Sequence, residues 1–392
     1  MTFYEELKER GVVKDVSSPD LEEKLNNESL TFYIGTDPTA DSLHIGHYAS
    51  FVTAKRLMLH GHKPIVLVGG ATGLIGDPRP TAERDIMPLE VLRKNVESLS
   101  KQVREVVGKD VEVVNNYDWT KGYEIMEFLR DIGKYINVNY MLNKDIIKRR
   151  LETGITFAEF TYTLLQGYDF LYLYEHKNCI MQVEGSDQWG NITTGIELIN
   201  KKLGKDAYAF TMPLILDSTG KKFGKSEGNA LWLDKNKTSS YDIYQYLINS
   251  SDEKVEEYLK VFTFLTKEEI ENVMASHREK PESRIAQKTL AYEFIKDLHG
   301  EEEAINAKKM SEDIFSGNVE NMPAVKVANS SYNIMDLLVE TGLCSSKSDA
   351  RRNIEQGGVK VNNEKVTDVN LTISIDSTII QKGKKNIIKV EN

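Results

Sequence analysis

A polar stretch at residues 36–47, with the sequence TDPTADSLHIGH, constrains the fold of this chain more than any other segment. It follows a short apolar run at residues 30–34 and precedes a helical pattern at residues 48–60. A strand, a polar loop and a helix in this order place backbone N–H groups and small polar side chains around a bound phosphate. The stretch, called the HIGH loop after its last four residues, lacks the glycine-rich signature of the usual nucleotide-binding folds.

The two histidines of the HIGH loop, His44 and His47, stand three residues apart. At helical spacing they share one face at the start of the following helix. Gly46 between them has no side chain, so a flat base can lie against the backbone there. Taken alone, the pattern also fits two histidines that cap or pack a helix, and it indicates a nucleotide site without proving one.

A second loop far along the chain carries Lys222-Phe-Gly-Lys-Ser226, called the KFGKS loop. Glycines at positions 220, 224 and 228 favour a mobile backbone, and Lys222 and Lys225 stand three residues apart. A loop of this kind can swing ammonium groups onto a transferring phosphate. Two lysines at this spacing are by themselves typical of a solvated surface, so the specific signal is the ordered pair of the two loops.

With both loops in this order, the chain resembles the class I aminoacyl-tRNA synthetases. The residues between the loops make it similar to the bacterial-type tyrosyl-tRNA synthetases, over nearly the whole chain. The resemblance implies tyrosine–tRNA ligase activity, with L-tyrosine, ATP and tRNA(Tyr) as partners. It also implies Mg²⁺ on the ATP phosphates, held mostly by ATP and water, and a homodimer, although the sequence itself shows no dimer interface.

Apolar runs and helical patterns alternate between the two loops. Strands are predicted at residues 30–34, 64–68, 111–114, 179–183 and 210–216, and helices at residues 48–60, 88–107, 123–134, 157–174 and 187–202. This alternation predicts an α/β fold with a Rossmann-like, doubly wound and mostly parallel sheet. Ligands of such sheets bind at the carboxyl ends of the strands, where the glycine-rich segment 69–78 is expected.

Five segments are expected along the chain. They are a Rossmann-like catalytic domain (1–220), the KFGKS loop with its connector (221–239), an α-helical domain (240–317), a linker (318–330) and an S4-like RNA-binding domain (331–392). The second domain is helical and acidic, and the resemblance makes it anticodon-binding. Pro323 and weak periodicity indicate the linker. The last segment reads as two short helices, at 334–340 and 347–356, and a glycine-led hairpin, which resembles an S4-type domain.

Charge is divided unevenly over the 392 residues, whose formal net charge is −10. Residues 331–392 carry nine Lys and Arg against eight Asp and Glu, a net charge of +1, while the remainder carries −11. RNA contact must therefore come from local patches. The candidate RNA-binding residues are Lys347, Arg351, Arg352, Lys360, Lys382, Lys384 and Lys385.

The composition excludes several classes of protein. The two cysteines, Cys179 and Cys344, stand in no metal or redox spacing, which fits a reducing cytoplasm. The N-terminal stretch is charged and amphipathic, unlike a signal peptide, and no apolar run approaches the length of a membrane span. We expect a cytoplasmic protein that has no membrane segment and no protein-held metal site.

A stripe of polar residues, Tyr162, Gln166 and Asp169, follows one face of an otherwise apolar predicted helix. A carboxylate on such a helix needs a partner. The stripe alone also fits buried polar groups that the protein satisfies by itself. The resemblance implies that Asp169 and Tyr33 bind the tyrosine hydroxyl. It further implies that Tyr162, Gln166 and Asp77 hold the substrate ammonium and that Gln188 lies near its carboxylate.

The resemblance also implies the ATP site. Thr39 and His44 donate to the γ-phosphate, and Lys222, Lys225 and Ser226 to the leaving pyrophosphate; these five are the expected catalytic residues. Asp187 and His47 bind the ribose. Ser50 keeps a hydroxyl where many members have threonine, and Arg84 reaches toward the pyrophosphate. The remaining expected ATP contacts are Gly35, Asp37 and Gly46.

Three alternatives stay open at this point. A tryptophanyl-tRNA synthetase shares both loops but needs neither the pair of Tyr33 and Asp169 nor the S4-like tail. An RNA-binding or splicing cofactor on a synthetase scaffold has no use for pyrophosphate ligands, so intact loops disfavour it. A nucleotidyltransferase can carry an HxGH loop but lacks tRNA-binding domains.

Overall fold

The computed structural model describes residues 1–78, 87–226, 229–316, 324–362, 364–376, 378–383 and 386–392. The chain divides into two compact units, Met1–Ala304 and Ile305–Asn392. Among the described residues, no helix has the length and apolar character needed to cross a membrane.

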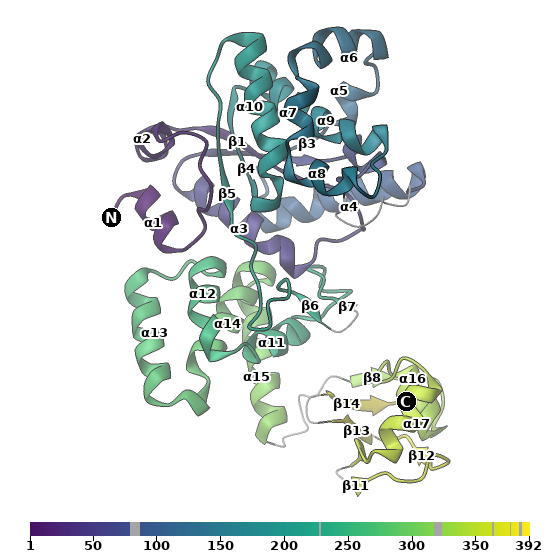
Figure 1. Ribbon diagram of the computed structural model, residues 1–392. Coiled ribbons are helices and arrows are strands. Elements are labelled where there is room, and N and C mark those ends of the chain that lie inside the picture. The colour runs from purple at the N-terminus through teal and green to yellow at the C-terminus, as the bar shows by residue number, and fades with distance from the viewer. Residues whose placement is uncertain (79–86, 227–228, 317–323, 363, 377, 384–385) are drawn as a thin grey trace. The chain divides into compact units, whose positions relative to one another are not determined.

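A parallel five-stranded sheet forms the centre of the first unit (Figure 1). Its strand order is β3-β2-β1-β4-β5, so the order of the chain reverses between β1 and β4. The strands are β1 (Thr31–Thr36), β2 (Lys63–Val68), β3 (Glu112–Asn115), β4 (Cys179–Gly185) and β5 (Tyr208–Met212). This topology confirms the Rossmann-like, doubly wound prediction, and in such sheets ligands bind at the reversal, here the carboxyl ends of β1 and β4.

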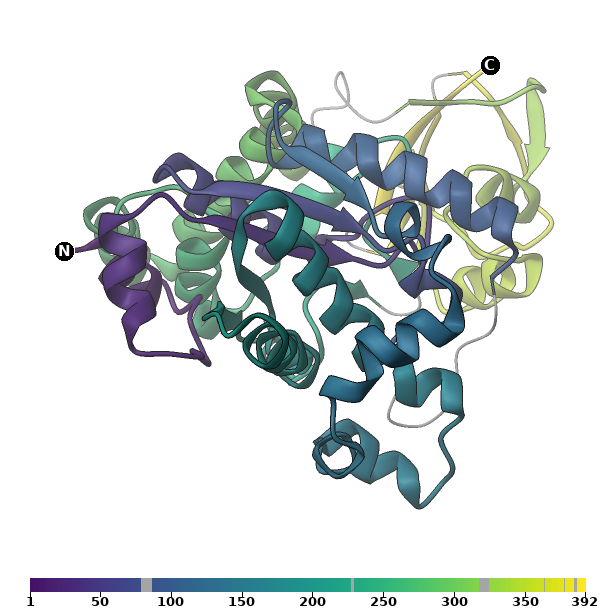
Figure 2. The same ribbon diagram turned by 90° about the horizontal axis from the view of Figure 1, so that it is seen from above.

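Helices cover both faces of this sheet (Figure 2). One face carries α3 (Ile45–Leu59) and α4 (Leu89–Val106), and the other carries α9 (Phe157–Lys177) and α10 (Trp189–Leu203). With both faces covered, the last four residues of β2 are all buried. That is why the parallel strands read in the sequence as short, nearly continuous apolar runs.

Several element boundaries differ from the predicted ones. Helix α3 begins at Ile45, three residues before the predicted start, because His44 caps it. Strand β5 ends at Met212 and does not reach residue 216, since Pro213 has no N–H group to continue the ladder. The predicted helix 187–202 begins as a 3₁₀ turn, Ser186–Gln188, before α10.

The segment between β3 and α9 holds more helices than the single one predicted at residues 123–134. The structure has α5 (Tyr117–Thr120), α6 (Ile125–Asp131), α7 (Val138–Leu142) and α8 (Asp145–Leu151), with a 3₁₀ turn at Gly133–Tyr135. Asn137 caps α7 by accepting from the N–H of Asn139. Helices of four to seven residues are too short to show a clear period in the sequence.

The rest of the first unit is helical, as predicted. Two short helices, α1 (Phe3–Glu9) and α2 (Asp20–Asn27), precede the sheet. After the short hairpin β6 (Lys225–Ser226) and β7 (Asn229–Ala230), the chain forms α11 (Ser240–Ile248), α12 (Asp252–Phe262), α13 (Lys267–Glu279) and α14 (Ile285–His299). Helix α15 (Glu301–Ser316) runs across the boundary between the two units.

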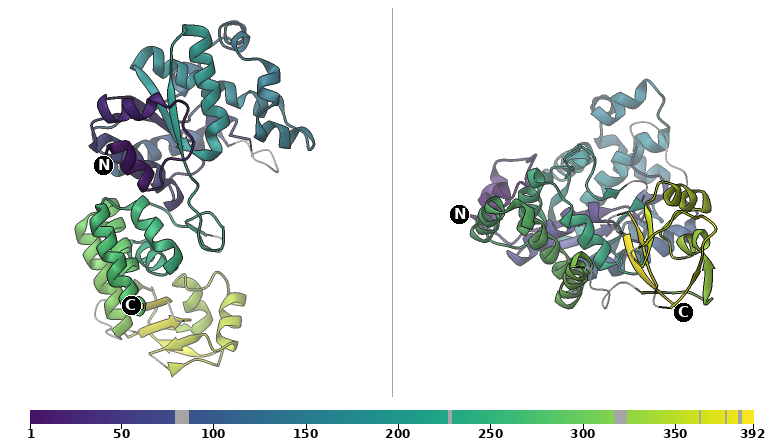
Figure 3. Two further views of the ribbon diagram at one scale, coloured as in Figure 1. Left: turned by 60° about the vertical axis from the view of Figure 1, so that its left-hand side comes forward. Right: turned by 90° about the horizontal axis from the view of Figure 1, so that it is seen from below.

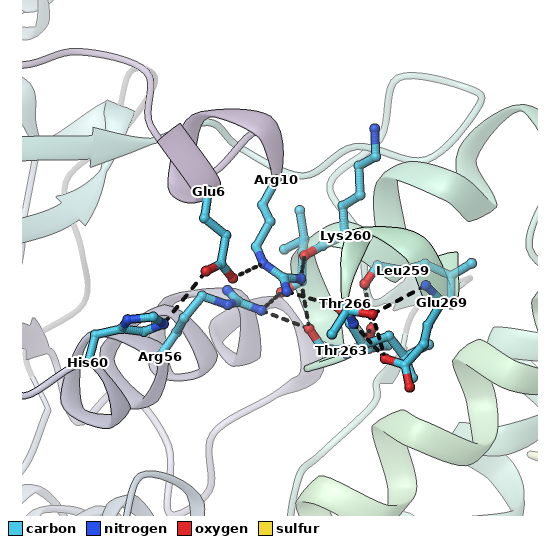
Figure 4. A network of polar contacts seen from close by, with 11 residues as sticks. Glu6, Arg10, Arg56, His60, Leu259, Lys260, Thr263, Thr266 and Glu269 are labelled. Carbon is cyan, nitrogen blue, oxygen red and sulfur yellow. Dashed lines mark hydrogen bonds and ion pairs between the residues drawn. The ribbon is translucent and has the colours of Figure 1, made fainter. Parts of the chain in front are cut away.

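Two arginines attach helix α12 to the sheet-containing part of the first unit (Figure 4). Arg10 donates to the carbonyl oxygens of Thr263 and Leu265, and Arg56 of α3 donates to the same Thr263 oxygen at 2.8 Å. The last carbonyl groups of a helix carry partial negative charge, so both guanidinium groups cap the C-terminus of α12. Burial, and secondly Arg10, lower the pKa of Arg56 to about 9, which leaves it charged at neutral pH.

The second unit has a mixed sheet of its own, with α16 and α17 packed on one side of it (Figure 3). The strand order is β11-β10-β13-β14-β8, and a separate pair joins β12 to β9. The elements are β8 (Ala324–Lys326), β9 (Ser331–Asn333), α16 (Ile334–Glu340), α17 (Lys347–Glu355), β10 (Val359–Val361), β11 (Glu364–Lys365), β12 (Thr372–Ser374), β13 (Thr378–Lys382) and β14 (Asn386–Glu391).

The predicted linker at residues 318–330 is wrong in its second half. Strand β8 lies inside it and pairs in parallel with β14 at the end of the chain. Residues 317–323 lie outside the described part. The predicted hairpin is confirmed, because β10 and β11 pair antiparallel.

Candidate active site

Four strand ends bring the polar residues of the site to one edge of the central sheet. Asp37 follows β1, the segment 69–72 follows β2, Asn116 follows β3 and the turn with Asp187 follows β4. Since parallel strands end on the same side, these residues all lie at the edge of the sheet where its strand order reverses between β1 and β4. Helix α9 adds its polar stripe from one face.

Asp169 is the buried carboxyl group of this site, with 2% of its surface exposed. One of its oxygens accepts from Asn116 Nδ2 at 2.9 Å and the other from Trp119 Nε1 at 2.8 Å. Burial raises the pKa of Asp169 to about 7, against the two hydrogen bonds, which lower it. Burial makes ionisation of Asp169 unfavourable, and a ligand O–H group that donates a hydrogen bond to it would stabilise the ionised carboxylate.

The hydroxyl group of Tyr33 is buried on β1 and makes no hydrogen bond of good geometry to any described residue. Gln182 stands opposite it on β4, close enough to lower the Tyr33 pKa slightly, yet its amide makes no such bond either. Burial, followed by the Asp169 charge, raises the pKa of Tyr33 well above its usual range. Buried polar groups without partners are costly, which indicates a place for a polar ligand group.

Two further carboxylates surround the hydroxyl group of Tyr162 on α9. Tyr162 donates to Asp37 Oδ2 at 3.1 Å, and Thr72 donates to Asp37 Oδ1 at 2.9 Å. Burial, and then the charges of Asp37 and Asp77, raise the pKa of Tyr162 well above its usual range. Carboxylates gathered around a buried hydroxyl create a negative potential that suits a ligand ammonium group.

Asp77 is held from α10 and the turn before it. It accepts from Gln188 Nε2 at 3.0 Å and from Asn191 Nδ2 at 3.1 Å. Asn191 in turn accepts from Thr163 of α9 at 2.8 Å, so the two helices share one polar network. Gln166 lies one turn beyond Tyr162 on the same face of α9 and is half-buried.

The two histidines of the HIGH loop form one stacked unit at the N-terminus of α3. His44 Nδ1 accepts from the N–H of Gly46 at 3.1 Å, and His47 Nδ1 accepts from the N–H of His44 at 3.3 Å. Their rings stack with centroids 3.8 Å apart. Burial, His44 and Lys222 lower the pKa of His47 to about 3, so His47 is neutral at pH 7. Each neutral ring that accepts at Nδ1 carries its proton on Nε2 and can donate from there.

The HIGH loop and the KFGKS loop touch through two glycines. A Cβ atom on Gly46 would lie 3.2 Å from the Phe223 carbonyl oxygen, and one on Gly224 would lie 2.0 Å from Ile45 Cγ2. Gly224 also has a φ of +82°, which disfavours any other residue. Beyond this contact, His44 pairs with Trp232 in an antiparallel bridge. The loops, far apart in sequence, therefore lie side by side as one site.

The remaining predicted ATP contacts lie around this junction. Lys222 Nζ lies 4.0 Å from Asp187 Oδ2, and both side chains are about half exposed. Thr39 is exposed at the end of β1, and Ser50 is half-buried on α3. Gly35 donates its N–H to the buried Glu184, whose pKa burial raises well above its usual range.

Some predicted residues cannot be placed in full. Lys225 and Ser226 form the first strand of the β6–β7 hairpin, and this pairing describes only their backbone. Arg84 lies outside the described residues. Within the described part of the chain, no group of three His, Cys, Asp or Glu side chains is arranged to hold a metal ion.

The candidate RNA-binding residues differ in their accessibility. Arg351 and Lys360 are exposed, while Lys347 pairs with Asp336 at 2.5 Å. Arg352 and Lys382 share Asp349, at 2.8 and 3.6 Å, and Lys382 also donates to the Leu343 carbonyl oxygen. Lys382 therefore holds β13 to α17 and is less available than predicted. Lys384 and Lys385 lie outside the described residues.

Sequence reasoning missed the residues that orient the predicted ones. Each forms a hydrogen bond to a predicted residue: Asn116 and Trp119 to Asp169, Glu184 to Gly35, Thr72 to Asp37 and Asn191 to Asp77. A usable signal existed for Asn116, a polar residue directly after a buried strand at the binding edge. For Trp119 on a four-residue helix there was none.

Comparison with known proteins gives two family matches. The model described as "tRNA synthetases class I (W and Y)" matches residues 25–316. The model described as "Tyrosine--tRNA ligase SYY-like C-terminal domain" matches residues 313–390. Together they span both compact units.

Similar solved structures include two fungal mitochondrial enzymes. A C-terminally truncated mitochondrial tyrosyl-tRNA synthetase from Aspergillus nidulans is 33% identical, with 80% of this chain and 94% of that one covered and a TM-score of 0.73. Its counterpart from Coccidioides posadasii is 34% identical over 79% and 91%, with a TM-score of 0.69. A tryptophanyl-tRNA synthetase from Encephalitozoon cuniculi, 17% identical over 80% and 90% with a TM-score of 0.57, shares the fold.

Proposed function

This chain belongs to the class I tyrosyl-tRNA synthetases, and on that premise we propose a role for each group of its site. Its activity is tyrosine–tRNA ligation, with ATP as the second substrate. The observation that carries the assignment of the pocket is the buried, unpaired hydroxyl of Tyr33 beside the buried carboxyl of Asp169. These two groups bind the phenol of tyrosine, which donates to Asp169 and accepts from Tyr33.

The ammonium group of tyrosine binds in the negative potential around Tyr162. Asp77, Tyr162 and Gln166 contact it, while Gln188 faces the substrate carboxylate. Asp37 lies in the same network and adds to the attraction. This arrangement leaves the carboxylate as the one end of tyrosine that points toward ATP.

Activation needs no general base, because the attacking carboxylate is already ionised. One carboxylate oxygen bonds to the α-phosphorus of ATP, and the bond from that phosphorus to the bridging oxygen breaks as pyrophosphate leaves with the electron pair. Catalysis is therefore positioning and charge stabilisation. Thr39 and His44 donate to the γ-phosphate, and Lys222, Lys225 and Ser226 to the leaving pyrophosphate. His47 and Asp187 hold the ribose. In the second step a hydroxyl of the terminal ribose of tRNA(Tyr) attacks the acyl carbonyl of the adenylate, and AMP leaves as the bond from that carbonyl to the phosphate oxygen breaks.

We propose that Mg²⁺ accompanies the ATP phosphates. Phosphate oxygens and water would be its ligands, which fits its reluctance to dehydrate, and the carboxylates of Asp37 and Asp187 stand at the same edge of the sheet. The metal would supply charge neutralisation of the phosphates, while residues of the chain orient the nucleotide.

Tyr33→Phe lowers the preference for tyrosine over phenylalanine, as the ratio of kcat/KM values, by about tenfold, since one hydrogen bond to the substrate is lost. The starting preference is roughly 10⁴–10⁵, a magnitude taken from tyrosyl-tRNA synthetases as a family. Amino-acid-dependent ATP–pyrophosphate exchange, run over all twenty amino acids, measures this preference in the native chain and in the variant. Tyr168→Phe, at a buried tyrosine of α9 whose ring packs edge-on against Tyr123, is the matched control. An unchanged ratio in Tyr33→Phe would remove this residue from the pocket.

We propose a homodimer that forms through an apolar surface on α6–α9. Of the 13 exposed large hydrophobic residues in the described part of the chain, six lie between residues 125 and 157. They are Ile125, Met126, Leu129, Val138, Leu151 and Phe157. Monomeric proteins rarely concentrate exposed apolar side chains in this way, and Phe157 is the first residue of α9, the helix that also carries Tyr162 and Asp169.

Phe157→Glu raises the dimer dissociation constant by roughly 10²-fold or more, because an unpaired charge inside an apolar interface is costly. Phe157 is 76% exposed in the single chain, so the substitution leaves the core intact. Sedimentation velocity over a concentration series measures the effect. Leu59→Glu, at an exposed leucine outside this surface, is the control. Equal dissociation constants for the two variants would place the interface elsewhere.

Further proposals concern the tRNA and the compartment. The helical segment 240–317 recognises the anticodon arm, and the S4-like segment 331–392 binds tRNA through Arg351, Lys360 and the neighbouring basic residues. The chain works in the cytoplasm, which two free, buried cysteines fit. Fractionation of cells that express the tagged chain tests the compartment.

A further inference from the structure

Phe223, in the middle of the KFGKS loop, is inserted into an aromatic cluster of the helical segment. Only 3% of its surface is exposed. Its ring centroid lies 4.7 Å from that of Phe262, 4.8 Å from Tyr258 and 5.4 Å from Tyr246. Aromatic pairs at these separations contribute beyond the area that they bury. The loop is thus anchored on α11 and α12 and not on the sheet.

Two tyrosine hydroxyls of the cluster bind the backbone on each side of Phe223. Tyr246 accepts from the N–H of Gly224 at 2.9 Å, and Tyr258 donates to the carbonyl oxygen of Leu216 at 3.0 Å. Leu216 and Lys222 face each other in an antiparallel bridge, so the second bond holds the base of the same turn. Of the two, only the Tyr246 bond lies inside the KFGKS sequence itself.

The same aromatic cluster packs behind the HIGH helix α3. The ring of Tyr48 lies 4.2 Å from that of Phe294 and 6.3 Å from that of Phe262. Tyr48 also donates its hydroxyl to Asp297 of α14, which pairs with Lys55. The HIGH helix and the KFGKS loop are therefore both fixed to one rigid base.

At Gly224 the loop is confined from two sides. Ile45 and Gly46 of the HIGH loop press against it, as the 2.0 Å approach to a Cβ atom at Gly224 shows. The Tyr246 hydroxyl binds it from the helical segment. Gly224 stands directly between Phe223 and Lys225, so its position determines where the backbone of Lys225 begins.

We propose that Tyr246 is a positioning residue for tyrosyl-adenylate formation, whose hydroxyl holds the KFGKS loop against the HIGH helix before the substrates bind. This inference rests on the proposed roles of Lys222 and Lys225. Groups that are held in place before the reaction spend less free energy on ordering in the transition state. The helical segment thus takes part in the chemistry through Tyr246, without contact with a substrate.

Tyr246→Phe lowers the rate constant of tyrosyl-adenylate formation by about five- to tenfold, the effect of one neutral hydrogen bond, while the dissociation constant of tyrosine stays unchanged. Stopped-flow measurement on the full-length enzyme gives both values. Trypsin cleavage at the exposed Lys221 and Lys222 becomes faster in the variant, at an unchanged melting temperature. Tyr292→Phe is the control, at a half-buried tyrosine of α14 outside the cluster whose hydroxyl donates to Glu301; it leaves the rate constant, the dissociation constant and the cleavage rate unchanged.

An unchanged or increased rate constant in Tyr246→Phe would overturn the proposal, and so would an equal loss in Tyr292→Phe. A second variant, Phe223→Leu, removes the ring contacts and is expected to lose rate in the same way. Failure of the underlying function is a separate result: Lys225→Ala with a full rate of adenylate formation would remove the lysine role itself, whatever Tyr246→Phe shows.

Discussion

Thr39→Ala and His44→Ala are each expected to lower kcat for tyrosyl-adenylate formation roughly 30- to 1,000-fold, with little change in KM for ATP. This loss corresponds to an activation free energy that is higher by about 2–4 kcal/mol. The magnitude follows by analogy with the loss of one donor to a developing oxyanion. Lys225→Ala behaves similarly. Pre-steady-state measurement of adenylate formation at saturating substrates gives the effect directly.

The split between kcat and KM has a physical cause. Thr39 is exposed three residues after β1, and His44 stands at the N-terminus of α3, where the helix dipole favours a bound anion. Negative charge on the phosphates grows as pyrophosphate leaves, and these contacts tighten in the transition state more than in the ground state. Interactions of that kind change kcat and leave substrate binding nearly unaltered.

His44 needs a control because it also caps α3. His44→Asn keeps a side-chain acceptor for the Gly46 N–H and retains an N–H donor, so it is expected to recover helix stability and part of the rate. Thr39→Ser keeps the hydroxyl and is expected to stay close to the native rate. A normal burst of adenylate in either alanine variant contradicts the assignment.

The central fold could be predicted because its causes are local. A strand buried on both faces, such as β2, reads as a continuous apolar run, and each run is followed by a helical period. Two of the boundary errors also had local causes. Pro213 ends β5 early, and the cap at His44 starts α3 before its first apolar turn.

Other features depend on contacts that no window of the sequence contains. Strand β8 is three residues long and becomes a strand only because β14, more than 60 residues later, pairs with it. In the same way, Asn116 and Trp119 meet Asp169 through the packing of α9 against the short helices after β3. Local propensity carries no information on these pairings.

In the candidate site, too, some features follow from the local sequence and others depend on contacts between distant segments. Of the residues that the resemblance named, Asp37 follows β1, Tyr162 and Asp169 lie on α9, and Tyr162 donates to Asp37 at the carboxyl edge of the sheet. What the sequence did not reveal is the support beneath them. The sequence did not indicate the aromatic partners of Phe223, Tyr246 to Phe262, which lie 23 to 39 residues further along the chain.

A chain that stops after Ser316 is expected to separate the two halves of the function. A stop at Ser330 would leave β8 without β14, so the better boundary is the end of α15. The first unit keeps its own core, and the two fungal structures show that truncated relatives fold. Tyrosine-dependent ATP–pyrophosphate exchange then continues at nearly the full rate, because the proposed tyrosine and ATP contacts all lie between Tyr33 and Ser226.

Aminoacylation by the same truncated chain is expected to fall by roughly 10²-fold or more in kcat/KM for tRNA(Tyr), since the proposed phosphate contacts lie in the tail. The body repels a polyanion with a net charge of −11, and exposed groups such as Arg351 and Lys360 offset this locally. The double variant Arg351→Glu with Lys360→Glu tests this surface in the full-length chain, without removal of a domain. The difference in tRNA affinity between the native chain and this variant is expected to shrink as the salt concentration rises. Undiminished charging by the truncated chain would exclude RNA binding by the tail, whereas a parallel loss of exchange would show that the tail supports the active site.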